Sequence, residues 1–373
     1  MTASEITAKE ITVSARDALR RGLLRVHGRS EALADGSITC DFTACGIAFT
    51  LDCAGEVRLT VSVHKPPVDL TPYATDHGYF TVLVDGERAD RAVRGGGTAV
   101  ETKNGVRVEG CRAEVILASG LPAGRHTFGF FKQSDPHMNL AEIHALTFTG
   151  TFALPPAAKK VLVEFIGDSL TAGYGNLGAP GIGSSDADYQ EGTSTYPVFA
   201  AGRLGFDVRV VARAGIGLRY CATYSQRPMS EVWHLQSYWR DEKKEYVPDR
   251  IPDLVVLNLF ANDRTKILSD KYPDANDIEY ELALRLFLEQ LWKFYPGVQI
   301  LLLNHPGSCE KLSWVLEHVV DISGPLLSVA DYHRYNQSGY ASHPDIAHNR
   351  LQAEELVTEL LWRYPDLFPS ERS

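Results

Sequence analysis

The chain has 373 residues, a length that suggests two domains. Hydrophobic residues make up 44% and charged residues 23%, an ordinary globular composition that excludes collagen-like, coiled-coil and disordered classes. Lysine and arginine number 37 against 47 aspartate and glutamate, so the formal net charge of -10 provides no general attraction to phosphate backbones or anionic membranes. Neither nucleic acid nor a membrane is an expected partner.

The amino-terminal residues 1–10 carry acidic and hydroxyl side chains, whereas a signal peptide begins with a basic region and an apolar run. No apolar stretch in the sequence is long enough to span a bilayer, so we expect a cytoplasmic protein. The cysteines are sparse, lie mainly in strand-like segments and form no C-x-x-C pair, which favours free thiols over disulfides or a zinc site. They are Cys40, Cys45, Cys53, Cys111, Cys221 and Cys309.

From about residue 20 to 152 the sequence consists of short alternating runs. Within 57–64 the odd-numbered residues are apolar and the even-numbered ones polar, the pattern of a half-buried antiparallel strand. Turn-forming residues such as Asp85-Gly86 and Pro122-Ala123-Gly124 separate the runs. The pattern predicts a β-sandwich domain over residues 1–154, with further strands at 79–84, 106–108, 113–117, 126–132 and 143–149.

After Pro155-Pro156 near-continuous apolar strands alternate with helical stretches, which is typical of a parallel sheet. A helix over about 278–295 is followed by Pro296-Gly297, and a last amphipathic helix begins near Ile346. For residues 155–373 we therefore predict a three-layer α/β/α domain. The five strands of its parallel sheet are expected at 161–166, 208–212, 254–259, 299–303 and 326–330.

Four polar motifs follow these strands or precede the last helix. Ser169 ends the first strand in a Gly-Asp-Ser-Leu motif, and Gly217 follows the second. Asn262 follows the third strand, and His343 comes just before the last helix. Because sites in parallel sheets lie at the carboxyl ends of the strands, we expect these residues at one edge of the sheet.

The four residue types supply what acyl transfer needs, namely a nucleophile, a base and donors for the oxyanion. Ser169 offers a hydroxyl, and His343 an imidazole suited to general-base catalysis near neutral pH. The amides of Ser169 and of Gly217, or of Gly215, could form the oxyanion hole with the Asn262 side chain. The G-x-S-x-G elbow of α/β-hydrolases is not present in the sequence.

On these motifs the chain resembles the SGNH, or GDSL, hydrolase superfamily. Its domain order is similar to that of carbohydrate esterase family 2, acetyl esterases in which a jelly-roll domain precedes the hydrolase domain. The resemblance implies that Ser169 is the nucleophile and His343 the base. It also implies that Gly217 and Asn262 are the glycine and asparagine of the oxyanion hole, and that residues 1–154 form a jelly roll.

One departure from the family pattern bears on the mechanism. The superfamily usually carries an aspartate three residues before the histidine, and this family often has it two residues before. Here those positions are Tyr340 and Ala341. The imidazole of His343 must then be oriented by a backbone carbonyl or by a distant acid such as Asp331 or Asp345.

Aromatic residues of the second half are candidates for stacking on a sugar, although packing in a long inter-strand segment explains them equally well. The candidate substrate-binding side chains are Trp314, Tyr196 and Trp233.

These features predict a serine esterase that removes O-acetyl groups from xylan- or mannan-type oligosaccharides through an acetyl-enzyme on Ser169. An acetylated oligosaccharide is the expected partner, and no metal or cofactor is expected because no ligand spacing was found. Within the enzyme class the alternative is a thioesterase or lysophospholipase of the same superfamily. Outside it, the alternative is a carbohydrate-binding protein whose catalytic site has decayed.

Overall fold

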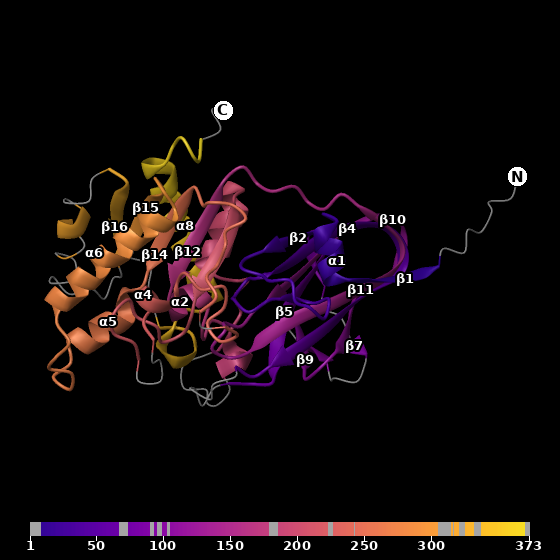
Figure 1. Cartoon of the computed structure of the whole chain (residues 1–373), viewed down its shortest axis with the longest axis horizontal. Helices are drawn as coiled ribbons and strands as arrows, with labels where there is room; N and C mark the ends of the chain where they lie inside the picture. Colours follow the sequence, from indigo (N-terminus) through magenta and orange to yellow (C-terminus); the bar gives the residue numbers. More distant parts are fainter. Residues whose placement is uncertain are drawn as a thin grey trace, which may run out of the picture.

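The structure is a computed structural model with two bodies of secondary structure (Figure 1). Strands of the amino-terminal half span residues 10–153, and the first strand of the carboxy-terminal half begins at Leu162. Within the described part of the chain, no helix is long and apolar enough to cross a membrane. The described residues are 9–66, 74–89, 93–94, 99–102, 105–178, 186–222, 227–241, 243–304, 315, 317–320, 325–331 and 337–369.

One antiparallel sheet forms the amino-terminal half. Its strand order is β1-β11-β4-β10-β5-β9-β8. The long central strands are β4 (Gly46–His64), β10 (Ala113–Lys132) and β11 (Leu140–Ala153). Around them lie β1 (Glu10–Ser14), β5 (His77–Val84), β8 (Ala99–Thr102) and β9 (Gly105–Glu109). The shorter elements are β2 (Leu24–His27), β3 (Ile38–Thr39), β6 (Glu87–Arg88), β7 (Val93–Arg94) and helix α1 (Ala15–Arg20).

The expected strands at 113–117 and 126–132 are one strand, β10. Pro122-Ala123-Gly124, predicted to form a turn, lies inside it, where the pairing with β4 shifts register three times. Such bulges let a strand bend without ending. The predicted turn at Asp85-Gly86 is confirmed, with both residues at positive φ between β5 and β6. The described strands of this half are thus all paired antiparallel, and the jelly-roll assignment stays a prediction.

The carboxy-terminal half contains the predicted five-stranded parallel sheet, in the order β13-β12-β14-β15-β16. The order of the strands reverses beside β12, and the crevice at such a switch point is where parallel sheets place their ligands. The strands are β12 (Leu162–Gly167), β13 (Asp207–Ala212), β14 (Leu254–Asn258), β15 (Gln299–Asn304) and β16 (Leu327–Asp331).

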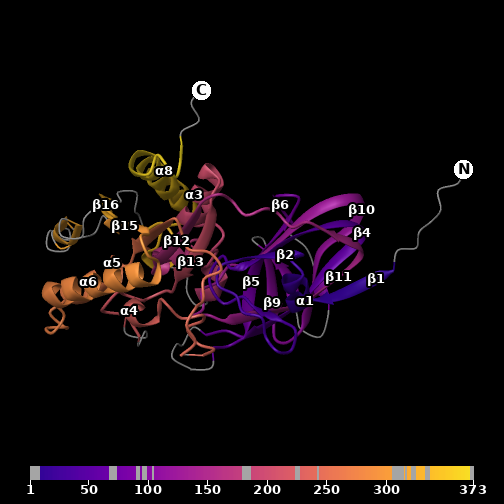
Figure 2. The ribbon, with the colours of Figure 1, turned by 45° about the horizontal axis from the view of Figure 1, so that its top comes forward.

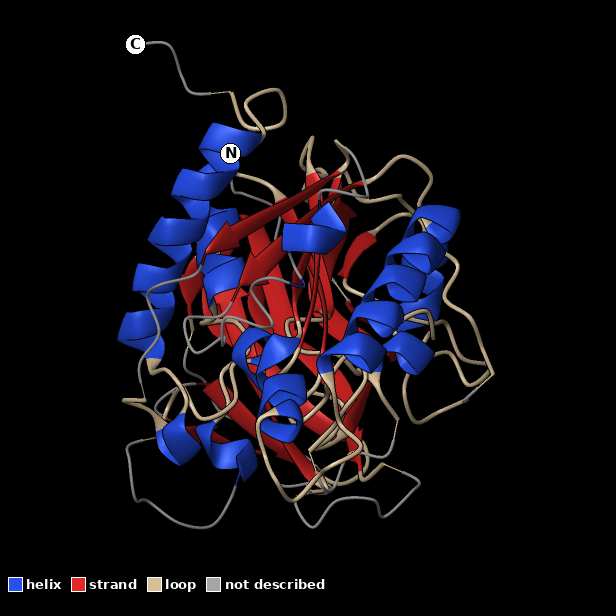
Figure 3. Ribbon diagram, turned by 90° about the vertical axis from the view of Figure 1, so that its left-hand side faces the viewer, coloured by secondary structure: helices blue, strands red, loops and turns tan. Residues whose placement is uncertain are grey.

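Helices lie on both sides of this sheet, which confirms the three-layer prediction (Figure 3). Helix α6 (Asp277–Phe294) packs against the face that carries Val255. Helices α3 (Tyr196–Leu204) and α8 (Ile346–Arg363) lie side by side on the face that carries Val256 (Figure 2). Neighbouring residues of a strand point to opposite faces, so both faces of β14 are apolar. The shorter helices are α2 (Ser169–Ala172), α4 (Met229–Val232) and α5 (Phe260–Ile267), with 3-10 turns at Asp186–Tyr189 and Tyr340–Ser342.

A buried charge cluster joins the two halves. Arg29, after β2, places Nη2 3.3 Å from Oε1 of Glu164 on β12, and both side chains are 0% exposed. Arg29 also donates to the carbonyl oxygen of Leu235 at 2.7 Å. Arg209 contacts the second oxygen of Glu164 at 3.2 Å. Because buried charges need partners, these contacts fix the two halves against each other.

Candidate active site

Ser169 is the first residue of α2, directly after β12. Asp168 caps this short helix, and its carboxylate accepts the amide of Leu170 at 2.9 Å. Burial raises the pKa of Asp168 to about 7. This strand-to-helix turn places Ser169 at the carboxyl edge of the sheet, the predicted position.

His343 contacts Ser169 directly. Its Nε2 lies 2.8 Å from Ser169 Oγ, and its Nδ1 lies 2.8 Å from the carbonyl oxygen of Ala341. A carbonyl oxygen only accepts hydrogen bonds, so Nδ1 carries the proton and Nε2 is free to take the proton of the serine. The arrangement is that of a nucleophile and its general base.

The loop that supplies this carbonyl is tightly folded. Ala341 and Ser342 have φ values of +51° and +63°, a region that costs a non-glycine residue on the order of 1–3 kcal/mol. The amide of Tyr340 donates to the carbonyl oxygen of Gly175 at 2.8 Å. At Gly175, whose φ is +74°, a Cβ would collide with the Tyr340 carbonyl oxygen. The segment after the nucleophile therefore holds the histidine loop in place.

The two distant acids considered as alternatives bind other groups. Asp331 Oδ1 accepts the side-chain amide of Asn304 at 2.9 Å. Asp345 caps α8, where Oδ1 accepts the amide of His348 at 2.8 Å. The group on the imidazole Nδ1 is thus the Ala341 carbonyl, one of the two predicted possibilities.

Burial lowers the pKa of His343 below its ordinary value, and the hydrogen bond to the Ala341 carbonyl opposes part of this shift. A carbonyl carries no net charge, so it stabilises imidazolium less than a carboxylate does. The imidazole is therefore neutral at neutral pH, the form that a general base requires.

The residues expected in the oxyanion hole lie on neighbouring segments. Asn262, in α5, donates its side-chain amide to the carbonyl oxygen of Ile216 at 2.8 Å. In a trans peptide the carbonyl and the next N–H point in opposite directions, and the amide of Gly217 faces the Cys221 sulfur at 3.5 Å. Among the described residues the buried amide of Gly215 has no hydrogen-bond partner.

A packing reason explains the glycine at 217. A Cβ there would collide with the carbonyl oxygen of Tyr220 and would lie 2.7 Å from Asp263 Oδ2. Asp263 is buried, and its carboxylate accepts the amides of Leu218, Arg219 and Tyr220 at 2.6–2.8 Å. Burial raises the pKa of Asp263 to about 7 although these three donors oppose the shift. This carboxylate fixes the loop after β13.

Asp135 holds the same loop from the other half of the molecule. It lies just after β10, is fully buried, and its Oδ2 accepts the amide of Ala214 at 2.8 Å. Ala214 directly precedes Gly215. Sequence reasoning missed Asp135 because nothing in its local pattern shows which loop it contacts.

Three half-buried tyrosines form a row of neighbouring rings that begins at the imidazole. The Tyr174 ring meets the His343 ring edge-on at 4.8 Å between centroids. Tyr340 lies 6.1 Å from Tyr174 and 4.8 Å from Tyr189. Sequence reasoning did not select them, although Tyr174 lies shortly after the nucleophile and Tyr340 occupies the position of the missing acid.

The aromatic side chains chosen as substrate-binding candidates lie elsewhere. Tyr196 is fully buried, and its hydroxyl lies 2.9 Å from Thr171 Oγ1. Trp233 is 2% exposed and packs edge-on against Phe287. Enclosed rings offer no face to a sugar, so the packing alternative accounts for both. Trp314 lies outside the described residues.

No protein-family model matches the chain. It is 28% identical over 273 residues to "Cellulase/esterase CelE" of Acetivibrio thermocellus, covering 68% of this chain and 32% of that protein. It is 26% identical over 223 residues to "Acetylxylan esterase / glucomannan deacetylase" of Cellvibrio japonicus, covering 56% of this chain and 60% of that protein. The chain thus spans less than two thirds of either curated relative.

Solved structures share the fold. A family two carbohydrate esterase from Clostridium thermocellum in complex with cellohexaose has a TM-score of 0.76 at 20% identity, covering 91% of this chain and 98% of that one. A family two carbohydrate esterase from Cellvibrio japonicus has a TM-score of 0.79 at 16% identity, covering 95% and 98%. The predicted resemblance to carbohydrate esterase family 2 is confirmed.

Proposed function

We propose that the protein is a serine esterase that removes O-acetyl groups from xylan- or mannan-type oligosaccharides. The observation that carries the proposal is the contact of 2.8 Å between Ser169 Oγ and His343 Nε2, with Nδ1 held by the Ala341 carbonyl. Support for the substrate class comes from the relative named acetylxylan esterase and glucomannan deacetylase and from the related esterase crystallised with cellohexaose.

In this reaction Ser169 Oγ attacks the acetyl carbonyl carbon while His343 Nε2 takes the hydroxyl proton. The imidazolium then returns the proton to the sugar oxygen, which leaves as a hydroxyl group. Water, deprotonated by the same imidazole, attacks the acetyl carbon of the acetyl-enzyme, and the imidazolium returns the proton to Ser169 Oγ as acetate leaves. The steps balance without a metal or cofactor.

We assign the oxyanion donors to the amides of Ser169 and Gly215 and to the second N–H of the Asn262 side chain. The Gly215 amide is buried and has no partner among the described residues, whereas that of Gly217 faces a sulfur atom. Preorganised donors of this kind stabilise the negative oxygen of the tetrahedral intermediate.

The finer architecture rests on the resemblance. We propose a jelly roll for residues 1–154 and a separate hydrolase domain for residues 155–373. Tyr174, Tyr189 and Tyr340 replace Tyr196 and Trp233 as the aromatic faces offered to a sugar. Tyr174 packs against His343, the rings of Tyr340 and Tyr189 continue from it, and all three are half-exposed.

The test compares hydrolysis of 4-nitrophenyl acetate and octanoate, and acetate release from acetylated xylo- and manno-oligosaccharides, by the wild-type protein and Ser169→Ala. We expect efficient cleavage of acetyl esters, poor cleavage of octanoate, and no activity in the folded variant. A preference for octanoate would support the lysophospholipase or thioesterase alternative. Oligosaccharide binding without hydrolysis would support the carbohydrate-binding alternative.

A further inference from the structure

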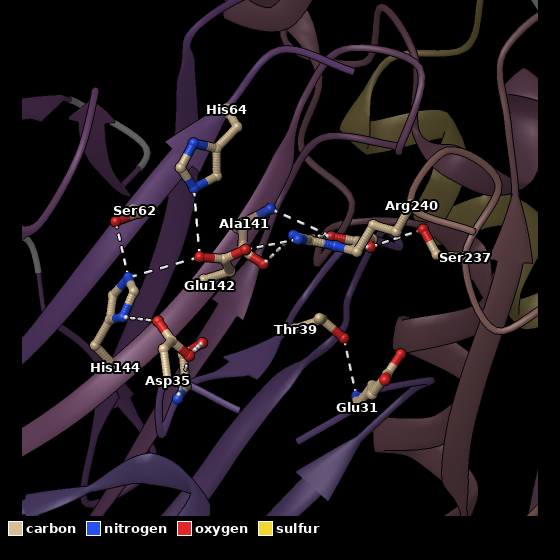
Figure 4. Close-up of polar contacts among 12 residues, drawn as sticks. Glu31, Asp35, Thr39, Ser62, His64, Ala141, Glu142, His144, Ser237 and Arg240 are labelled. Atoms are coloured by element: carbon tan, nitrogen blue, oxygen red, sulfur yellow. Dashed lines mark hydrogen bonds and ion pairs between the residues drawn. The ribbon is translucent and has the colours of Figure 1, made fainter. Parts of the chain in front are cut away.

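Two histidines and two carboxylates meet on the amino-terminal half. They come from the loop before β3 (Asp35), the end of β4 (His64) and the strand β11 (Glu142 and His144). Figure 4 shows their side chains turned toward one another. We propose that this cluster binds one divalent transition-metal ion of the zinc type.

The β-sheet brings these residues together. Ser62 on β4 lies opposite Glu142 on β11, and His64 is two residues further along the same face. Glu142 and His144 are also two residues apart. The pairing with β4 shifts at His144, which makes it the extra residue of a β-bulge, a device that re-aims a side chain.

The donor atoms are close to the spacing of a metal site. His144 Nδ1 lies 3.6 Å from Asp35 Oδ2, and His64 Nε2 lies 3.4 Å from Glu142 Oε2. One donor atom each from Asp35, Glu142 and His144 lies within 4.8 Å of the other two. Tetrahedral zinc with bonds of about 2.0–2.2 Å holds its donors roughly 3.3–3.6 Å apart. Glu142 Oε2 also lies 3.8 Å from His144 Nε2, so the Glu142 carboxylate has to turn toward Nδ1 to close the site.

His144 has the surroundings of a metal-binding imidazole. Its side chain is 8% exposed, and Nδ1 is buried with no hydrogen-bond partner. Nε2 lies 2.8 Å from Ser62 Oγ, so the other ring nitrogen is held in the way that metal-binding histidines usually are.

The charge of the cluster suits a dication. Arg240 donates to Glu142 Oε1 at 2.6 Å, and Ser37 donates to Asp35 Oδ1, which leaves the other carboxylate oxygens for the cluster. Arg112 is 3.9 Å from Asp35 Oδ2, but it is 65% exposed and can turn into solvent. Imidazole nitrogens with carboxylates favour zinc-type ions over Ca²⁺ and Mg²⁺, which prefer oxygen ligands alone.

A bound ion would join the loop before β3 to β4 and β11. Through Glu142 it would also support Arg240, which belongs to the carboxy-terminal half and binds Asp41 with two nitrogens. An ion that binds only the folded state raises the stability of that state. The proposal therefore predicts a stabilising site that is independent of the esterase reaction.

The test titrates the chelator-treated full-length protein with Zn²⁺ alone, and with Ca²⁺ and Mg²⁺ for comparison. Calorimetry and metal analysis should show one Zn²⁺ per chain, and Tm should rise. His144→Gln and Asp35→Asn should each weaken Zn²⁺ binding by at least about tenfold. The control His126→Gln, an imidazole on β10 that pairs with Asp85, should bind Zn²⁺ as the wild-type protein does.

Equal Zn²⁺ affinity in His144→Gln and the wild-type protein would overturn the proposal, because the ion would then lie elsewhere. Preferential binding of Ca²⁺ or the absence of stoichiometric binding would also overturn it. Circular dichroism checks that both variants are folded. Asp35→Asn keeps an acceptor for the Ser37 amide, so it tests the site even where His144→Gln fails to fold.

Discussion

A peptide carbonyl holds the His343 imidazole in place. The residue that supplies this carbonyl, Ala341, needs no chemistry of its own, only a backbone in the left-handed region. The energy of that strained turn is offset by hydrogen bonds from the segment after the nucleophile, including the one between Tyr340 and Gly175. Orientation of the base thus depends on backbone conformation.

The pH profile should reveal this arrangement. Burial lowers the pKa of His343 from the ordinary 6.5, and the neutral imidazole is the active form. Activity should be present above the lowered pKa and lost as the pH falls through it. We expect kcat/KM for 4-nitrophenyl acetate, measured between about pH 4 and 9, to fall with a midpoint below 6.5. A midpoint above 6.5 would indicate a carboxylate on Nδ1.

Substitution of the two distant acids should have little effect. Asp331→Asn and Asp345→Asn should each keep at least about a tenth of the wild-type kcat, whereas His343→Ala should abolish turnover. Asparagine caps helices about as well as aspartate, so Asp345→Asn should also keep α8 intact. Steady-state kinetics and thermal melts check both. If either Asn variant were as inactive as His343→Ala and still folded, that aspartate would be the third triad member.

Asn262→Ala should lower kcat by about 10²–10³-fold, the usual loss for one oxyanion donor. The variant also loses the hydrogen bond to the Ile216 carbonyl, so Tm should fall slightly. A fall in Tm with unchanged kcat would give Asn262 a purely structural role. Kinetics with 4-nitrophenyl acetate and a thermal melt distinguish the two.

Sequence motifs were sufficient to predict that Ser169 and His343 meet, because both follow from the rule that parallel strands end at one edge. Residue type was not sufficient to assign a role to Trp233 and Tyr196, because an aromatic ring can pack in a core as well as stack on a sugar. Nor could it identify Ala341 as the source of the carbonyl, since alanine has no particular preference for the left-handed region.

At the scale of elements, the segment after β10 holds the loop after β13 in position. Lys132 is buried and donates to the carbonyl oxygens of Asp41, Ser134 and Asp135 at 2.6–3.2 Å. Burial lowers the pKa of Lys132 to about 8. The backbone of Asp135 is thereby fixed while its carboxylate holds the amide of Ala214.

Asp135→Ala should leave the buried amide of Ala214 without an acceptor, which costs about 1–3 kcal/mol. Because Gly215 is the next residue, we expect kcat to fall while KM changes less. The two oxygens of Asp135 accept the amides of His137 and Ala214, so Asp135→Asn keeps one of the two acceptors and should restore part of the kcat. A loss of Tm in Asp135→Ala without a change in kcat would limit Asp135 to a role in stability.

The strand β10 shows why element boundaries were harder to predict than element types. Pro122 and Gly124 are residues of turns and of bulges alike, so their presence did not distinguish a hairpin from a bent strand. The distinction came from pairing with β4, a contact between segments far apart in the sequence. Most of the parallel strands were predicted well because they are buried on both faces and therefore mainly apolar, whereas the edge strand β16 is only partly buried.

At the scale of the whole molecule, the halves are joined by charge as well as by apolar contact. Arg29 stacks its guanidinium 4.5 Å from the Tyr246 ring centroid and reaches Glu164 on β12. Here the arginine comes from the amino-terminal half. In a second set of contacts the arginine, Arg240, comes from the carboxy-terminal half and pairs with Asp41 and Glu142 of the amino-terminal half. Separating the halves would expose each of these charged groups to solvent or leave it without its partner.

Arg29→Ala should lower the free energy of unfolding by about 3–5 kcal/mol, because it leaves Glu164 short of a buried partner. Arg58→Ala, which removes surface pairs with Glu10 and Glu56, is the control and should cost less than about 1 kcal/mol. Denaturant unfolding measures the change in the free energy of unfolding for both variants. For the same reason a 156–373 fragment should be insoluble or inactive, and a soluble, fully active fragment would contradict this account.

The buried pair also imposes an order on biosynthesis. Arg29 and Glu164 are 135 residues apart in the sequence, and ribosomes add roughly 5–20 residues per second, so the nascent arginine exists for about 7–27 s before its counter-ion is made. The strands of the first sheet pair only with one another and are complete at Ala153, so that sheet can form while Arg29 is still hydrated. Closure of the interface, and with it the docking of Asp135 on the loop after β13, has to wait until the downstream half has been translated. The newborn chain therefore acquires its catalytic arrangement only after the downstream half, with His343, has been made.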